Sequence, residues 1–234
     1  MYAVKFYNSI LFLAKKSCCT QMVDFCDSLA LSLNDNIRSD IIYFDFQKAF
    51  DSVNHDIILN KLKTQYNIDG KLLRFFIKYL KGRTQRVVIN NEKSSILRVN
   101  SGVPQGSILV PLIFIMFLND ITDGLSEGTN ITMYADDTKL WRCINKTDDH
   151  YILQRDINHL LDWAVRNLKT FHPQKCKALP ITTCHRPQTD FIYSIADTPI
   201  EYSELEKDLG IYINRKLNWN EHCDKILSKA LIKD

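Results

Sequence analysis

Two adjacent aspartates, Asp136 and Asp137, stand between two short apolar segments, and this arrangement strongly limits the structures open to the chain. The flanking residues 131–134 and 138–142 are typical of short strands, which places the aspartates at the tip of a predicted hairpin. Like charges repel, and both carboxylates lose hydration wherever the hairpin is buried. We therefore expect a compensating positive charge, and a metal ion is the strongest candidate because Mg²⁺ prefers hard oxygen ligands.

A third aspartate, Asp45, ends the apolar segment 41–44, which predicts a buried strand. A lone carboxylate is costly to bury in such a place. A sheet that brings Asp45 beside the pair would form a two-metal site, in which one ion activates an attacking oxygen and the other steadies a leaving oxygen. Such sites catalyse nucleotidyl transfer, which depends on positioning and charge stabilisation. Taken singly, the pair is more typical of a solvated turn, and Asp45 of a helix cap or a salt bridge.

Helical and strand-like periodicities alternate along the rest of the chain. The predicted helices cover residues 22–33, 55–66, 71–81, 108–121, 147–168 and 220 onward. The remaining predicted strands cover residues 85–89, 95–99, 176–182, 191–195 and 209–213, with a turn at 90–93 between the first two. This order indicates an α+β fold, with a mixed or antiparallel sheet and helices on one face.

The size and charge of the chain permit a nucleic-acid partner without requiring one. Its 234 residues suffice for one domain, or for one domain and part of a second. The net charge of +3 is weaker than that of most dedicated nucleic-acid binders. The longest apolar run, residues 108–118, is too short to cross a bilayer, so no membrane partner is expected. The seven cysteines form no CxxC pair, which favours free thiols in a reducing compartment over a zinc site.

Several longer segments of the sequence form a characteristic series. They are YFDFQKAFDSVNH at 43–55, SGVPQGS at 101–107, YADD at 134–137, and residues 168–177 followed by DLGI at 208–211. Together they resemble the motifs of the reverse transcriptase family, most closely those of non-LTR (LINE-type) retrotransposons. The likeness spans about residues 10–230. Intron-maturase and retron enzymes are a sister interpretation, which the LINE-like KAFD and NH of the first segment make less fitting.

The resemblance implies one reverse transcriptase domain over residues 1–234, with a right-hand polymerase palm made of an antiparallel sheet backed by helices. The implied boundaries are palm at about 40–55 and 101–215, partial fingers at about 1–39 and 56–100, and the start of a thumb at about 216–234. The earlier finger strands and a full thumb have no counterpart here, so a truncated element copy is expected.

The resemblance also implies the metal ligands and a general acid. Asp45 and Asp136 would be the principal ligands of two Mg²⁺ ions, with Asp137 in support and the backbone carbonyl of Phe46 facing the metal. Mn²⁺ would fit the same donors. Lys175 resembles the lysine proposed to protonate the pyrophosphate leaving group, and an ordinary surface lysine is an equally open interpretation.

A second set of residues is implied to contact the incoming nucleotide and the template. Phe50 lies where the family carries an aromatic ring that blocks a ribose 2′-hydroxyl, although a simple core role stays open. Gln105 would lie near the nucleotide and the template base. Gly102, Pro104 and Gly106 would shape a loop whose backbone can approach a ligand closely, and an ordinary loop before a helix would use the same residues.

The primer is implied to lie over Tyr134, with Leu209 and Gly210 in the primer grip. The activity implied is RNA-directed DNA synthesis, with an RNA template, a DNA primer and dNTPs as partners, inside the cell in the nucleus or cytoplasm. One alternative is a non-catalytic nucleic-acid-binding remnant of a decayed retroelement. Another is a chain that folds poorly and has no activity.

Overall fold

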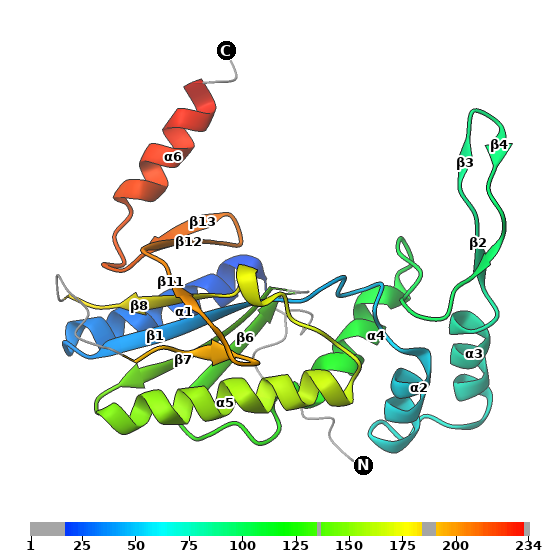
Figure 1. Ribbon diagram of the computed structural model, residues 1–234, viewed down its shortest axis with the longest axis horizontal. Helices are drawn as coiled ribbons and strands as arrows, with labels where there is room; N and C mark the ends of the chain where they lie inside the picture. The colour runs from blue at the N-terminus through cyan, green and yellow to red at the C-terminus, as the bar shows by residue number, and fades with distance from the viewer. Residues whose placement is uncertain (1–16, 135–136, 184–190, 232–234) are drawn as a thin grey trace.

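A five-stranded sheet forms the centre of the computed structural model, which describes residues 17–134, 137–183 and 191–231 (Figure 1). The strand order is β11-β8-β1-β7-β6. The strands are β1 (Arg38–Asp45), β6 (Thr129–Tyr134), β7 (Asp137–Ile144), β8 (Lys177–Ile181) and β11 (Glu201–Tyr202). Neighbouring strands are antiparallel, except that the short edge strand β11 runs parallel to β8. The predicted α+β fold with an antiparallel sheet is therefore confirmed.

Helices cover both faces of this sheet. Helix α1 (Cys18–Asn34) packs on one face and α5 (Thr147–Arg166) on the other. The alternation of side chains along β1 explains the two layers, since Ile41 belongs to the core with α1 and its neighbour Ile42 to the core with α5. The expectation of helices on one face only is wrong, because the apolar run of β1 is buried on both sides.

Three further helices extend the core beyond the sheet. They are α2 (His55–Thr64), α3 (Gly70–Leu80) and α4 (Leu109–Leu118), with the 3-10 turn η1 (Asn119–Thr122) directly after α4. The predicted helix 108–121 therefore changes to a tighter helix in its last turn. The buried Lys61 joins α2 to α4 and η1. Its ammonium donates to the Phe117 carbonyl oxygen at 2.7 Å and pairs with Asp120 at 2.6 Å.

A long hairpin projects from the end of α3 (Figure 1). Its strands are β2 (Thr84–Gln85), β3 (Val88–Ile89), β4 (Glu92–Lys93) and β5 (Leu97–Arg98), in which β2 pairs with β5 and β3 with β4. The predicted turn at 90–93 is too long. Asn90 and Asn91 alone form it, with φ values of 48° and 67°, because asparagine tolerates the left-handed conformation that a two-residue hairpin turn requires. Glu92 and Lys93 consequently belong to a strand.

The C-terminal part contains two small hairpins and a helix. They are β9 (Ser194–Ile195) with β10 (Thr198–Pro199), β12 (Leu205–Asp208) with β13 (Ile211–Asn214), and α6 (Asn220–Leu231). The predicted strand 191–195 is reduced to its last two residues. The predicted strand 209–213 begins only at Ile211, because Leu209 and Gly210 have φ values of 47° and 91° and form the turn after β12. Helix α6 has no buried residue and extends away from the sheet (Figure 1).

The six cysteines among the described residues are free thiols. Within the same residues, no helix has both the length and the apolar character needed to span a membrane.

Candidate active site

The ends of β1 and β7 bring two of the predicted carboxylates together. Asp45 is paired directly with Asp137 in the antiparallel ladder. Side chains in such positions have Cβ atoms about 4.5–5.5 Å apart, and like charges there destabilise the pairing. Asp136, the third predicted carboxylate, lies outside the described residues. The predicted meeting of Asp45 with the aspartate pair is therefore observed for Asp137.

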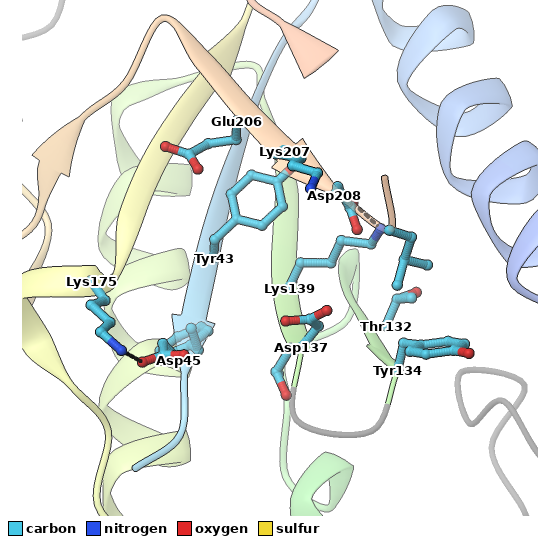
Figure 2. A pocket seen from close by; sticks show the side chains of 13 residues that line it. Tyr43, Asp45, Thr132, Tyr134, Asp137, Lys139, Lys175, Glu206, Lys207 and Asp208 are labelled. Carbon is cyan, nitrogen blue, oxygen red and sulfur yellow. Dashed lines mark hydrogen bonds and ion pairs between the residues drawn. The ribbon is translucent and has the colours of Figure 1, made fainter. Parts of the chain in front are cut away.

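A pocket of about 250 Å³ opens over these carboxylates (Figure 2). Five of the predicted site residues line it, which are Asp45, Tyr134, Asp137, Lys175 and Leu209. The sheet explains most of this grouping, because Tyr134 of β6 pairs with Asp137, which in turn pairs with Asp45. These three side chains thus form one row across three strands. Leu209 reaches the same pocket from the turn after β12.

Lys175 supplies a positive charge beside this row. It ends the 3-10 turn η2 (Pro173–Lys175), and its ammonium lies 3.3 Å from Asp45 Oδ2 (Figure 2). The backbone holds η2 against β1, because the His172 N–H donates to the Asp45 carbonyl oxygen at 2.8 Å. The lysine side chain is 62% exposed, so a ligand in the pocket can reach it. Its role as a general acid stays a prediction.

The donor set at the end of β1 suits a hard divalent cation. Asp45 and Asp137 offer carboxylate oxygens, the ligand type that Mg²⁺ and Mn²⁺ prefer. The described part of the chain holds no group of three or more His, Cys, Asp or Glu side chains placed to bind a metal. A complete carboxylate set would therefore need Asp136.

The backbone of Phe46 is also fixed at this point. Phe46 forms an isolated antiparallel bridge with Phe171, and their rings stack with centroids 4.4 Å apart. The two hydrogen bonds of the bridge run from the Gln47 N–H to the Thr170 oxygen and from the His172 N–H to the Asp45 oxygen. Neither bond uses the Phe46 carbonyl, so that oxygen is not engaged by the bridge.

A second pocket, of about 770 Å³, contains the predicted nucleotide and template residues Gly102, Pro104 and Gln105. Gln105 donates from Nε2 to Asp51 Oδ1 at 3.0 Å, which fixes its amide against the turn after β1. Three basic side chains also line this pocket, namely Lys48, Arg83 and Arg98. The predicted residues Phe46, Phe50, Gly106 and Gly210 line neither of these two pockets.

The loop 101–107 is held tightly against the segment that follows β1. The Gly102 N–H donates to the Val53 carbonyl oxygen at 2.8 Å, and the Gly102 oxygen lies 2.8 Å from His55 Nε2. Gly102 has φ +85°, and a Cβ atom there would lie 2.9 Å from the Asp51 carbonyl oxygen. Gly106 has the same φ but open space around it. Only the first glycine is therefore required by a close approach of two backbone segments.

Phe50, in the turn at residues 47–52 that follows β1, packs half-buried against Phe114 of α4, with ring centroids 4.4 Å apart.

Lys169, the residue that supports this turn, is not identified in the sequence analysis. The buried ammonium of Lys169 donates to the Ala49 carbonyl oxygen and, at 2.9 Å, to Ser52 Oγ. No local motif marks Lys169, because its partners are more than a hundred residues away in the sequence.

Lys139 and Asp208 were also missed as site residues, although both line the first pocket and form an ion pair with each other (Figure 2). Lys139 lies two residues after Asp137 and so shares its face of β7. This alternation of side chains along β7 is the sequence signal that marks Lys139. Asp208 is the first residue of the DLGI segment, but the strand predicted there begins only at Leu209 and so leaves Asp208 out.

Comparison with known proteins settles the family. Residues 5–202 match the family described as reverse transcriptase (RNA-dependent DNA polymerase). The chain belongs to the reverse transcriptase family. A similar curated relative is the RNA-directed DNA polymerase from mobile element jockey of Drosophila funebris, with 30% identity over 79% of this chain and 20% of the relative. Another is the probable RNA-directed DNA polymerase from transposon X-element of Drosophila melanogaster, with 26% identity over 82% of this chain and 21% of the relative.

Solved telomerase structures share the fold of this reverse transcriptase chain. The telomerase from Candida tropicalis in complex with a TWJ fragment of telomeric RNA aligns with a TM-score of 0.62 and 12% identity, over 92% of this chain and 34% of the telomerase chain. The same enzyme in its apo form, truncated from its C-terminal domain, aligns with a TM-score of 0.58 and 14% identity, over 90% of this chain and 40% of that one. At this identity the likeness concerns the fold alone.

These comparisons confirm the predicted membership of the reverse transcriptase family of non-LTR type, and the right-hand polymerase fold. The chain spans about a fifth of the length of the curated relatives that it matches.

Proposed function

We propose that this domain catalyses RNA-directed DNA synthesis, adding dNTPs to the 3′ end of a primer by two-metal nucleotidyl transfer. The observation that carries the proposal is the direct pairing of Asp45 with Asp137 at the ends of two antiparallel strands, over a pocket. A like-charge pair destabilises the sheet, and a bound cation relieves that cost. Membership of the reverse transcriptase family supports the same function.

Asp45, Asp136, Asp137 and the Phe46 carbonyl are the residues that would hold two Mg²⁺ ions, with Mn²⁺ as a chemical equivalent. When bound, the ions would activate the primer 3′-hydroxyl and neutralise charge on the triphosphate. The sheet contributes preorganisation, because the ladder sets the separation of Asp45 and Asp137 before any substrate arrives.

Lys175 would donate a proton to the departing pyrophosphate oxygen. Its ammonium lies 3.3 Å from Asp45, and its side chain is exposed. This position supports the role, because a ligand held at the carboxylates could contact the lysine. Phe50 would exclude a ribose 2′-hydroxyl, and the contact of its ring with that of Phe114, at 4.4 Å between centroids, would hold the ring in place.

The template and primer would lie on opposite sides of the carboxylates. Gln105, in the loop shaped by Gly102, Pro104 and Gly106, would contact the nucleotide and the template base. Tyr134, Leu209 and Gly210 would contact the primer end, and the first two of these line the pocket of Asp45. Membership of the reverse transcriptase (RNA-dependent DNA polymerase) family supports a nucleic-acid template as partner. The division into palm, fingers and thumb stays part of this proposal.

The deciding experiment is primer extension on an RNA template with dNTPs and Mg²⁺, comparing the wild-type chain with Asp136→Asn. A matched control is Asp148→Asn, which removes an exposed carboxylate from the first turn of α5. We expect extension by the wild type and the control and none by Asp136→Asn. Salt-sensitive binding of primer–template without extension by folded wild-type protein would overturn the proposal and favour a non-catalytic binding remnant.

A further inference from the structure

The first pocket contains a buried ion pair between two strands that are far apart in the sequence. Lys139 of β7 and Asp208 of β12 contact each other through ammonium and carboxylate, and each side chain is only 5% exposed (Figure 2). The ring of Phe25 lies 3.9 Å from the same ammonium. The pair therefore joins three elements, namely β7, β12 and α1.

Both partners adjoin residues of the candidate site. Lys139 follows Asp137 by two residues, so the two side chains leave β7 on the same face. Asp208 is the last residue of β12 and is followed directly by Leu209 and Gly210, whose positive φ values make the turn. The ion pair thus lies between the carboxylate row and this turn.

Backbone hydrogen bonds hold the base of the hairpin of β12 and β13, since the Thr182 N–H donates to the Arg215 carbonyl oxygen at 2.9 Å and the Ser203 N–H to the Ala178 oxygen at 2.8 Å. The turn at the other end of the hairpin is held to the described fold by side chains. The two strands pair with each other and form a separate sheet, so within the described residues no ladder joins them to the five central strands. Ile213 is buried in the core with α1, and Leu209 and Ile211 pack against that core. Apolar contacts tolerate sliding, whereas a buried ion pair is satisfied in one arrangement only and therefore gives specificity more than stability.

We propose that the Lys139–Asp208 ion pair positions the Leu209–Gly210 turn relative to Asp45 and Asp137, and thereby determines where the 3′ end of a primer lies. This inference rests on the proposed function. Neither residue is assigned a chemical step. Both are positioning residues that act through the turn.

The test uses the full chain with the double substitution Lys139→Met/Asp208→Leu, which removes both charges and leaves no unpaired one in the core. The conservative variant Lys139→Arg keeps the pair. The control Lys177→Met/Glu201→Gln removes another interstrand ion pair, at the exposed edge between β8 and β11. Three quantities are measured for each: amide hydrogen exchange of residues 205–214, the Kd of a fluorescent primer–template by anisotropy, and the primer KM and kcat of extension.

We expect the double variant to unfold cooperatively, with hairpin amides exchanging about tenfold faster than in the wild type. Its primer–template Kd and primer KM should each rise about tenfold, while kcat at saturating primer stays within about twofold. Lys139→Arg and the control should resemble the wild type.

Unchanged exchange and unchanged Kd in the double variant would overturn the inference, and so would a fall in kcat at constant KM. If the wild type itself fails to extend a primer, the proposed function fails. Exchange and anisotropy, which need no chemistry, then still decide whether the pair positions the turn.

Discussion

The ammonium of Lys169 donates a hydrogen bond to the backbone carbonyl of Ala49, directly before Phe50. Burial lowers the pKa of Lys169 from its ordinary 10.5 to about 8, and nearby Asp51 only partly offsets this effect. Between these two values the unfolded chain holds a proton that the folded chain has released. Linkage then makes the folded state more stable as the pH rises through this window.

Lys169→Met should remove this pH dependence. The wild type should gain about 3 kcal/mol in free energy of unfolding between pH 8 and 10.5, since one pKa unit corresponds to about 1.4 kcal/mol, and the variant should not gain it. The difference in stability between wild type and variant should therefore grow by that amount over this pH range. Urea unfolding at several pH values measures this difference. Lys71→Met, on the exposed start of α3, is the control and should show no such trend. A constant difference between Lys169→Met and wild type would contradict the prediction.

Gly102→Ala and Gly106→Ala form a matched pair for the loop that carries Gln105. Both alanines carry the strain of φ +85°, but only the Cβ at 102 meets a backbone oxygen, that of Asp51, at 2.9 Å. A backbone oxygen cannot move away from the new Cβ atom as the end of a flexible side chain can. We expect Gly102→Ala to be more destabilising than Gly106→Ala by about 1–3 kcal/mol, the usual cost of overpacking. Equal losses in denaturant unfolding would show that the approach to Asp51 is not limiting.

Phe50→Val should relax the discrimination against ribonucleotides. The smaller side chain no longer fills the space beside Phe114, so a 2′-hydroxyl meets less obstruction. The ratio of kcat/KM for dNTP to that for rNTP should fall by about tenfold or more, the scale on which pocket shape discriminates between substrates. Phe75→Ala, at an exposed position of α3, should leave the ratio unchanged. An unchanged ratio in Phe50→Val would favour a core role for Phe50.

Asp137→Asn should separate stability from activity. Removing one of two facing charges should change the free energy of unfolding in chelator by no more than about 1 kcal/mol, because the lost repulsion from Asp45 is opposed by the lost attraction to Lys139. The proposed role of Asp137 as a metal ligand predicts that extension falls by about a thousandfold, which corresponds to about 4 kcal/mol of transition-state stabilisation. Thermal unfolding with chelator and single-turnover extension with Mg²⁺ give the two values. A variant that is several kcal/mol less stable in chelator would show that Asp137 supports the fold as well as the reaction.

The sequence was sufficient to predict the central part of the site. Asp45 ends an apolar run and Asp137 begins one, and an antiparallel ladder between such runs places the two carboxylates opposite each other. Strand and helix periodicity located β1, β7 and α5 because each has a strong local pattern. The right-hand polymerase architecture came from the resemblance of the motifs, since periodicity alone does not order the strands.

The parts that sequence reasoning missed depend on contacts between distant residues. Strand β12 has no apolar alternation, since Leu205 is followed by Glu206 and Lys207, and the charge of Asp208 at its end is matched by Lys139 of the distant strand β7. The strand predicted at residues 209–213 includes Leu209, but this leucine has a positive φ, which leucine rarely adopts. Tertiary packing overrides the local preference at this position.

Strand β1 lies between β7 and β8 and is hydrogen-bonded to both, which has a consequence at the level of the gene. Side chains alternate with a period of two, so one extra codon within β1 would turn Asp45 toward the face that carries Phe44 and α5. The reading frame would survive, and so would the codons of all the proposed metal ligands. A copy of such a gene can therefore keep all its motif residues and still encode a chain whose carboxylates point apart, so spacing as well as residue identity decides which copies are intact.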